Sequence, residues 1–239
     1  MFDAYSKMEL LIGKERVDKL SRTKVLVFGL GGVGSYVVEA LARCGVGVLT
    51  LVDNGVVTIA DSSSQLLATR STVGKSKVQA AKERIADIDE DIIVHTYETF
   101  YGNETEGLID FSAYDYVVDA IDTVDSKILI IENAKKLSIP VISCMDTGNK
   151  IDPSKFEIAD ISKTGACPLA KMIRSELRKR KIGKVKVLYS KEKPVQNTKG
   201  KRKKEMIQNP IPGSISFVPA AAGLLIAGEV IRDLIEWRK

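Results

Sequence analysis

Cysteine and histidine are scarce in this chain of 239 residues, which has three cysteines and one histidine. Cys44, Cys144 and Cys167 are far apart, no C-x-x-C pair occurs, and His95 completes no familiar zinc-ligand spacing with them. We therefore expect no structural zinc site. An odd number of separated cysteines indicates reduced thiols rather than a disulfide framework.

Long apolar runs are also missing. The most apolar stretch, from Phe217 to Gly228, is followed by Glu229 and Arg232 and is shorter than the about 20 residues that a membrane-spanning helix requires. Residues 1–20 carry acidic side chains and no long apolar core, so they do not resemble a secretory signal. We therefore expect a cytoplasmic protein that does not enter a membrane.

Acidic residues are nearly absent between Lys171 and Lys204, where fifteen lysines and arginines stand against Glu176 and Glu192. The whole chain has a formal net charge of +5, so the remainder is net acidic. Such asymmetry is typical of a protein with one edge that binds a polyanion. For the run 199–204 taken alone, a solvated charged loop is an equally good interpretation.

Short apolar runs alternate with amphipathic segments over the first part of the chain. The spacing predicts strands at 24–29, 46–53, 91–98, 114–122 and 139–145. It predicts helices at 33–46, at 72–89 with Thr72 as N-cap, and at 125–137. Strands that alternate with helices form a parallel sheet covered on both faces. The fold expected is α/β, a Rossmann-like, doubly wound and mostly parallel sheet.

The pattern changes after Asp152-Pro153. A strand at 155–164, a basic helix at 168–181, a strand at 184–190, a polar basic loop and a closing helix at about 218–236 follow. We interpret the chain as a single domain, residues 1–239. Its nucleotide-binding core is residues 22–152, and residues 153–239 form a basic C-terminal extension with the closing helix.

The run VLVFGLGGVG at residues 25–34 joins the first of these strands to a helix. In the spacing Gly29-x-Gly31-x-x-Gly34, which also contains Gly32, glycines permit a tight turn, close approach of phosphate, and close helix–strand packing. Free N–H groups at the helix start favour phosphate oxygens. Asp53, nineteen residues past Gly34, ends the next strand and is suited to ribose hydroxyls. These features predict a nucleotide site and fit NAD and ATP equally.

Longer segments distinguish these two ligands. GLGGVGSYVVEALARCGVGVLTLVD, TVGKSK and VVDAID closely resemble the E1-like adenylating enzymes, which include ubiquitin activators and bacterial activators of sulfur-carrier proteins. Within that group, SCMDTGNKIDPSKFEIADISKT and GSISFVPAAAGLLIAGEVI are most similar to the tRNA threonylcarbamoyladenosine dehydratase branch. The resemblance covers nearly the whole chain.

The resemblance implies roles for residues near the ends of strands. Asp53 would hold the ribose, Lys77 would neutralise phosphate charge, and Asp122 would hold Mg²⁺. The catalytic residues expected are Lys77 and Asp122, which the resemblance implies, and Arg70, which could compensate for a missing family arginine. The implied cofactor-binding residues are Gly29, Gly31, Gly32, Gly34, Asp53, Gln65, Lys77 and Asp119.

The family reaction implied is the activation of a carboxylate by ATP. The carboxylate attacks the α-phosphorus, an acyl adenylate and pyrophosphate form, and an internal nucleophile then displaces AMP. In the tRNA branch the carboxylate belongs to a threonyl group on an adenosine, and the product is a cyclised ring. The resemblance thus implies ATP and Mg²⁺ as cofactors, a homodimer, and a tRNA held by the basic segment 171–204.

The chain departs from the family pattern near the expected site. DSSSQ stands where relatives have Asn-x-Asn-Arg-Gln, so Ser63 and Ser64 replace an asparagine and a phosphate-facing arginine. Lys7 stands where an arginine is expected, and in some relatives that arginine reaches ATP from a partner subunit. Asp146 stands where glycine is expected. A serine supplies no cation, and one lost charge-assisted contact costs about 10²–10³ in rate. Arg70 or Arg16 are the candidates to compensate.

Three other interpretations remain open from the sequence. An adenylating activator of a sulfur-carrier protein would not need the basic segment, and many such activators carry C-x-x-C pairs. A degenerate relative would bind nucleotide or RNA without turnover. An NAD-dependent oxidoreductase ranks last, because nothing resembles a hydride-transfer site. Cys167 is more simply a buried thiol than a thioester-forming nucleophile, and Cys44 and Cys144 are expected to pack in the core.

Overall fold

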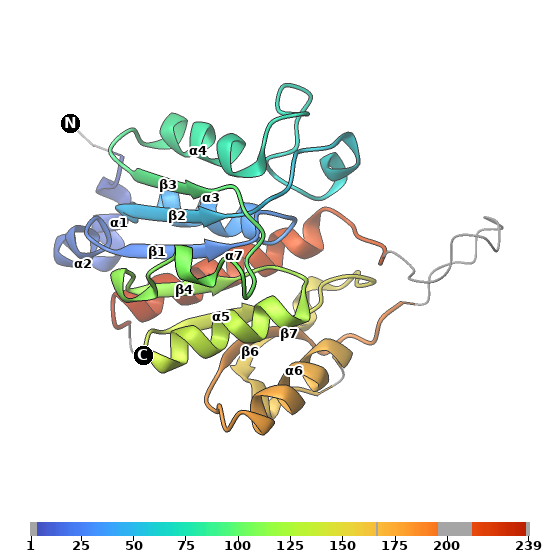
Figure 1. Cartoon of the computed structure of the whole chain (residues 1–239). Coiled ribbons are helices and arrows are strands. Elements are labelled where there is room, and N and C mark those ends of the chain that lie inside the picture. The colour runs from blue at the N-terminus through green and yellow to red at the C-terminus, as the bar shows by residue number, and fades with distance from the viewer. Residues whose placement is uncertain (1–3, 166, 196–211, 238–239) are drawn as a thin grey trace.

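A seven-stranded sheet with helices on both faces forms the body of the protein (Figure 1). The computed structural model describes residues 4–165, 167–195 and 212–237. The strands, in the spatial order β3-β2-β1-β4-β5-β7-β6, are β1 (Lys24–Phe28), β2 (Val48–Val52), β3 (Ile93–Tyr97), β4 (Tyr116–Asp119), β5 (Val141–Cys144), β6 (Phe156–Asp160) and β7 (Lys186–Ser190).

All neighbouring strands pair in parallel except β6, which runs antiparallel to β7 at one edge. This confirms the predicted α/β, mostly parallel and Rossmann-like fold. The strands of the C-terminal extension do not form a sheet of their own. They continue the same sheet, because β7 pairs with β5 through Ile142 to Cys144.

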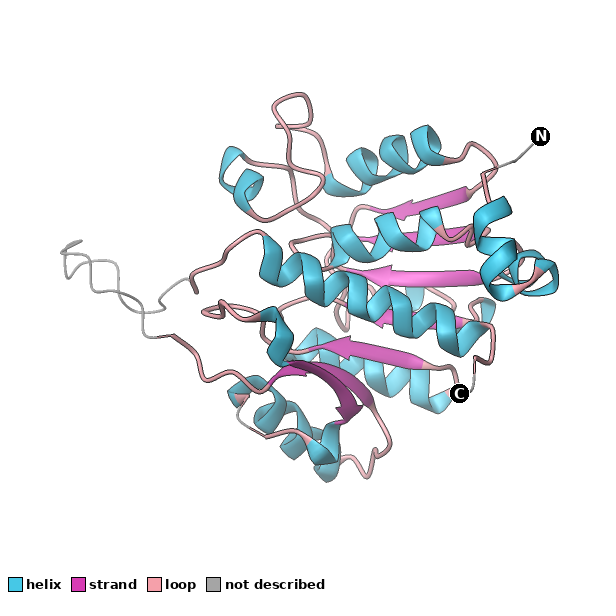
Figure 2. Cartoon of the chain, turned by 180° about the vertical axis from the view of Figure 1, so that it is seen from behind, coloured by secondary structure: helices cyan, strands magenta, loops and turns pink. Residues whose placement is uncertain are grey.

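Seven α-helices and five short 3₁₀ helices are present in the described part of the chain. They are α1 (Ser6–Ile12), α2 (Lys14–Leu20), α3 (Gly34–Arg43), α4 (Lys77–Ile88), α5 (Val124–Lys136), α6 (Pro168–Lys179), α7 (Phe217–Leu234), η1 (Ile59–Ser63), η2 (Glu106–Leu108), η3 (Phe111–Ala113), η4 (Pro153–Lys155) and η5 (Ile161–Lys163). Helices α3, α4 and α7 cover one face of the sheet (Figure 2), and α5 and α6 cover the other (Figure 1). None of these helices is long and apolar enough to cross a bilayer.

Apolar side chains on each face of the sheet explain this layering. Central strands β1 and β4 are buried on both faces, as parallel strands under two helical layers must be. On one face α7 packs closely on α3, since a Cβ at Gly223 would lie 2.5 Å from the carbonyl oxygen of Val33. This contact requires glycine and lets α7 lie directly against α3.

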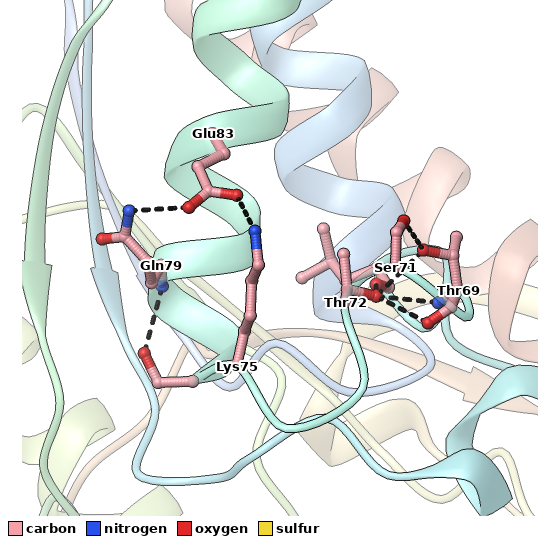
Figure 3. A network of polar contacts seen from close by, with 8 residues as sticks. Thr69, Ser71, Thr72, Lys75, Gln79 and Glu83 are labelled. Atoms are coloured by element: carbon pink, nitrogen blue, oxygen red, sulfur yellow. Dashed lines mark hydrogen bonds and ion pairs between the residues drawn. The ribbon is translucent and has the colours of Figure 1, made fainter.

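The predicted N-cap of α4 was wrong. Helix α4 starts at Lys77, and the Oγ of Ser76 accepts a hydrogen bond from the Gln79 N–H at 3.3 Å. Thr72 instead lies in a turn, where its Oγ1 accepts from the Thr69 N–H at 2.8 Å (Figure 3). Gly74, at φ 90°, then redirects the chain before the helix.

Candidate active site

The carboxyl ends of β1, β2 and β4 open into one cavity of about 270 Å³. The strand order reverses there, since β1 lies between β2 and β4, and ligands of open α/β sheets bind at such a point. Its lining residues are Phe28, Gly29, Gly31, Gly32, Val52, Asp53, Asn54, Gln65, Lys77, Thr99, Phe100, Tyr101, Ala120, Ile121, Asp122 and Thr123.

Most of the site residues predicted from the sequence therefore line the same cavity, although they lie on five separate segments. Three predicted residues do not line it. They are Gly34, Arg70 and Asp119.

The glycines of the turn have different roles. Gly29 has φ 85°, and a Cβ there would lie 2.6 Å from the carbonyl oxygen of Ala120. A Cβ at Gly34 would lie 1.8 Å from the carbonyl oxygen of Gly29, so Gly34 permits the packing of α3 on β1. A Cβ at Gly31 would contact nothing within 4 Å, so space for a ligand remains over this residue. The turn thus presents N–H groups to the cavity at the start of α3.

Asp53 fastens the turn to the neighbouring strand. Its Oδ2 accepts the Leu30 N–H at 2.7 Å and its Oδ1 accepts the Gly55 N–H at 2.6 Å. Each oxygen retains a second lone pair, so the carboxylate can still accept hydrogen bonds from hydroxyl groups. Such a carboxylate can therefore hold a ribose while fixing the glycine turn.

Lys77 is the first residue of α4, and its stem lies beside the loop after β2. A Cβ at Gly55 would be 3.2 Å from the Lys77 Cε and 2.9 Å from the Asp53 Oδ1. The other nearby lysine is engaged elsewhere: Lys75 Nζ lies 2.6 Å from Glu83 Oε2, and Gln79 binds the other oxygen of Glu83 at 3.0 Å (Figure 3). Lys77 forms no ion pair with any residue that the structure describes, so its ammonium is available to an anion.

Asp122 follows β4 and lies at the exposed mouth of the cavity. Its carboxylate makes no hydrogen bond with the described residues. Desolvation raises the pKa of Asp122, and the charges of Asp119 and Asp146 raise it further, whereas Lys127 and Lys77 lower it. This unpaired carboxylate is therefore the acid of the cavity best suited to a cation.

Asp119 lies beneath the cavity and is fully buried. Lys127, 1% exposed, donates to its two oxygens at 3.0 and 3.1 Å and to the Cys144 carbonyl at 2.7 Å. The hydroxyl of Ser143 also donates to Asp119. Sequence reasoning missed Lys127, because nothing in an amphipathic helix distinguishes a buried lysine from a solvated one.

The positions that depart from the family pattern lie at two ends of the molecule. Ser64 is near the glycine turn, since its carbonyl oxygen would be 3.4 Å from a Cβ at Gly32. Arg70 is exposed on the following turn. Lys7 in α1 and Arg16 in α2 lie where the strands begin, at the opposite edge of the sheet (Figure 1). Within one chain, Arg16 therefore cannot replace the missing arginine.

The loop after β5 anchors the basic segment. The Asn149 carbonyl oxygen accepts the Val195 N–H at 2.8 Å, its N–H donates to the Gly213 carbonyl at 2.8 Å, and its Oδ1 accepts the Gly213 N–H at 2.7 Å. Three residues earlier, Asp146 Oδ1 accepts the Gly148 N–H at 2.8 Å. Both described ends of the segment that contains the run 199–204 thus lie beside the carboxyl edge of the sheet. The run itself lies outside the described residues.

The cysteines offer no nucleophile to the cavity. Cys167 is 4% exposed, and its Sγ accepts the Ala170 N–H at 3.5 Å as the N-cap of α6, so the predicted buried thiol is confirmed. Burial raises the pKa of Cys144 to about 12. No group of three or more acidic, histidine or cysteine side chains that could hold a metal occurs in the part of the chain that the structure describes.

Known proteins resemble this chain over its full length. A curated tRNA threonylcarbamoyladenosine dehydratase of Bacillus subtilis is 44% identical to it, and the alignment covers 99% of this chain and 96% of the relative. The crystal structure of E. coli tRNA N6-threonylcarbamoyladenosine dehydratase in complex with ATP is 27% identical, with a TM-score of 0.85 over 98% of this chain and 94% of that one.

A yeast adenylyltransferase and sulfurtransferase, from Saccharomyces cerevisiae, is 33% identical over 62% of this chain, which is only 33% of that protein. The model of the family described as ThiF matches residues 5–239. The chain therefore belongs to the ThiF family of E1-like proteins.

Proposed function

We propose that this protein is an ATP-dependent dehydratase that cyclises threonylcarbamoyladenosine in tRNA by adenylating its carboxylate. One observation carries the proposal. The glycine turn, Asp53, Gln65, Lys77 and Asp122 come from separate segments and meet in one cavity at the reversal point of the sheet. The full-length similarity to the Bacillus subtilis dehydratase supports the choice of substrate.

The positions of these residues in the cavity suggest a role for each of them. The N–H groups of the glycine turn bind phosphate oxygens, and Asp53 accepts the ribose hydroxyls. The ammonium of Lys77 supplies positive charge to the phosphates, and no acid among the described residues pairs with it. The acids fit Mg²⁺, since Mg²⁺ in such sites takes one or two carboxylates together with substrate phosphates. Asp122 would hold it, and Mg²⁺ would neutralise phosphate charge.

In the chemistry proposed, the substrate loses the elements of one water, because one carboxylate oxygen leaves in AMP and the attacking nucleophile gives up a proton. The carboxylate of the threonyl group attacks the α-phosphorus of ATP, and pyrophosphate leaves. A nucleophile within the same modified nucleoside then attacks the acyl carbon, the ring closes, and AMP leaves. The protein positions the reactants and stabilises charge, so no covalent enzyme intermediate is needed. A tRNA substrate implies action in the cytoplasm.

The direct test is to incubate the protein with ATP, Mg²⁺ and tRNA that carries threonylcarbamoyladenosine, and to analyse the nucleosides by mass spectrometry. We expect the nucleoside to lose one water with the release of one AMP. ATP binding without either product would contradict the proposal and favour a degenerate relative. AMP formation only with a small protein that ends in Gly-Gly would favour a sulfur-carrier activator.

Restoring the family arginine by Ser64→Arg is expected to raise kcat. Ser64 lies beside Gly32, so an arginine there can reach the phosphates that the turn binds, and one such contact contributes about 10²–10³ in rate. Single-turnover AMP release measures the gain, and Ser62→Arg, on the exposed η1, is the matched control. No gain at position 64 would mean that another group already supplies this charge.

We also propose a homodimer, supported by exposed apolar side chains on two elements. Phe217, Leu224 and Leu225 of α7 are 45%, 51% and 42% exposed, and Leu10 and Leu11 of α1 are 81% and 76% exposed. Singly exposed leucines are ordinary, but groups of them mark interfaces. A second copy would also be needed for any residue of α1 to reach a nucleotide cavity.

Leu224→Glu/Leu225→Glu is therefore expected to convert the dimer to a monomer, because burying two carboxylates in an apolar interface costs several kcal/mol. Light scattering on the eluting peak measures the mass. The matched control is Leu108→Glu, which is 57% exposed in η2 and is expected to leave the mass unchanged. A monomeric wild-type protein, or a dimer that survives both changes, would contradict this interface.

A further inference from the structure

The C-terminal ends of α5 and α6 lie side by side and bring together cations from two distant stretches of sequence. Arg180 Nη1 lies 2.7 Å from Glu132 Oε2, and Lys135 Nζ donates to the Lys184 carbonyl at 2.7 Å. We call the cations gathered here the α5–α6 basic surface. They are Lys135, Lys136, Arg178, Lys179, Arg180, Lys181 and Lys184.

Acids neutralise only part of the α5–α6 basic surface. Glu132 pairs with Arg180 and, at 3.5 Å, with Lys136, and Glu176 pairs with Lys179 at 2.5 Å. Asp160 accepts hydrogen bonds from the backbone and hydroxyl of Ser162.

The remaining cations have no such partner. Arg178, Lys181 and Lys184 are exposed and form no ion pair with any acid among residues 4–165, 167–195 and 212–237. Seven cations therefore stand against three carboxylates, and the surplus is concentrated on the turn after α6.

The turn at residues 181–184 separates two hollows. One, of about 450 Å³, lies between η5 and α6 and includes Arg178, Lys181 and Lys184 in its lining. The other, of about 370 Å³, lies between α5 and the turn and includes Lys135, Lys136 and Arg180. Cations thus border two adjacent concavities that share the residues of the turn.

The backbone of this turn is costly for lysine. Lys181 and Lys184 have φ of 58° and 55°, a left-handed conformation that costs a non-glycine residue about 1–2 kcal/mol. Glycine or asparagine would suit both positions better. At Lys181 this conformation ends α6, since the N–H groups of Lys181 and Ile182 donate to the carbonyls of Arg178 and Leu177 at 3.1 and 2.9 Å.

We propose that the α5–α6 basic surface binds the phosphodiester backbone of RNA; that this RNA is the substrate tRNA rests on the proposed function. A surface of unneutralised lysines and arginines gains affinity for a polyanion by releasing its counterions. Lys186, which belongs to the basic segment predicted from the sequence, is not part of this surface. Its Nζ forms ion pairs with Glu229 and Asp233 at 2.7 and 2.5 Å. It also adds Lys135 and Lys136, which lie outside that segment.

The position of the surface defines what it can do. Helices α5 and α6 end where β5 and β7 begin, so the surface lies at the edge of the sheet opposite the nucleotide cavity (Figure 1). It therefore contacts a part of the RNA that is distant from the reacting nucleoside. Its contribution is to affinity, seen in KM for tRNA, and kcat is independent of it.

The test is the double variant Lys181→Asn/Lys184→Asn in the full-length protein. Asparagine tolerates the left-handed conformation, so we expect an unchanged or higher Tm. We expect affinity for an unmodified tRNA transcript to fall about tenfold or more near 0.1 M salt. The slope of log K against log salt should become shallower by about 1.5, as for two lost phosphate contacts.

The matched control is Lys14→Gln/Lys82→Gln, which removes two exposed lysines from α2 and α4 and is expected to change affinity less than twofold. Unchanged RNA binding in the asparagine variant, or an equal loss in the control, would overturn the proposal. RNA binding that depends on the surface in a protein that dehydrates no nucleoside would refute the proposed function and leave the surface standing. Dehydration of the nucleoside by a protein whose RNA binding does not depend on the surface would support the proposed function and refute the role of the surface.

Discussion

Replacing Asp122 by asparagine is expected to slow adenylation on the order of 10³-fold while leaving the fold intact. Asp122 is the unpaired carboxylate of the nucleotide cavity, and Lys77 provides the facing positive charge. An amide retains the size of the side chain but removes the negative charge that would hold a divalent cation against phosphates. Single-turnover AMP release measures the loss, and nucleotide affinity should change far less.

Stability provides the internal control for this variant. The folded-state pKa of Asp122 is raised, so any stabilisation by this group is present at low pH, when it is protonated, and is lost as pH rises through the folded pKa. The charged form of Asp122 therefore does not stabilise the fold, and Asp122→Asn should have an equal or higher Tm. Asp125→Asn, the same change on the exposed first turn of α5, should leave the rate unchanged. An Asp122→Asn enzyme within threefold of wild-type rate would contradict the assignment.

The fold and much of the cavity could be predicted because both depend on local patterns. Glycines that follow a strand, and single polar residues that end strands, are visible in the sequence, and parallel strands bring their carboxyl ends together. Asp53 and Asp122 are accordingly where a parallel sheet must place them. The start of α4 was misjudged because Thr72 and Ser76 both suit an N-cap. Tertiary contacts decide between them, since the Lys77 N–H donates to the Gly55 carbonyl.

Pairings between distant segments could not be predicted in the same way. Asn149 holds both ends of a long segment through its backbone and its side-chain oxygen, and nothing in the sequence of the loop indicates these distant partners. Lys135 joins the turn after α6 only because two helices end side by side. The same is true of Lys127, whose partners come from β4 and β5. In each case a residue type that is ordinary on a surface acquires its role from packing.

Lys127→Met is expected to lower the free energy of unfolding by about 3–5 kcal/mol, because it leaves Asp119 charged and unpaired in the core. This is a large part of the 5–15 kcal/mol typical of a whole domain. Urea unfolding measures the free energy. Lys136→Met removes a lysine from the exposed face of the same helix and should cost less than about 0.5 kcal/mol. A loss below about 1 kcal/mol in Lys127→Met would contradict a buried ion pair.

The double variant Asp119→Asn/Lys127→Met separates support of the fold from support of the site. An asparagine oxygen can still accept from Ser143, so we expect most of the lost stability to return. Asp119 also accepts the Ile121 N–H at 3.2 Å and thereby fixes the loop that packs on Gly29 and carries Asp122. If the pair only stabilises the core, the refolded double variant regains full adenylation. If the pair also positions Asp122, stability returns while kcat stays low. The affinity for ATP is then unchanged, because the glycine turn and Asp53 are not altered.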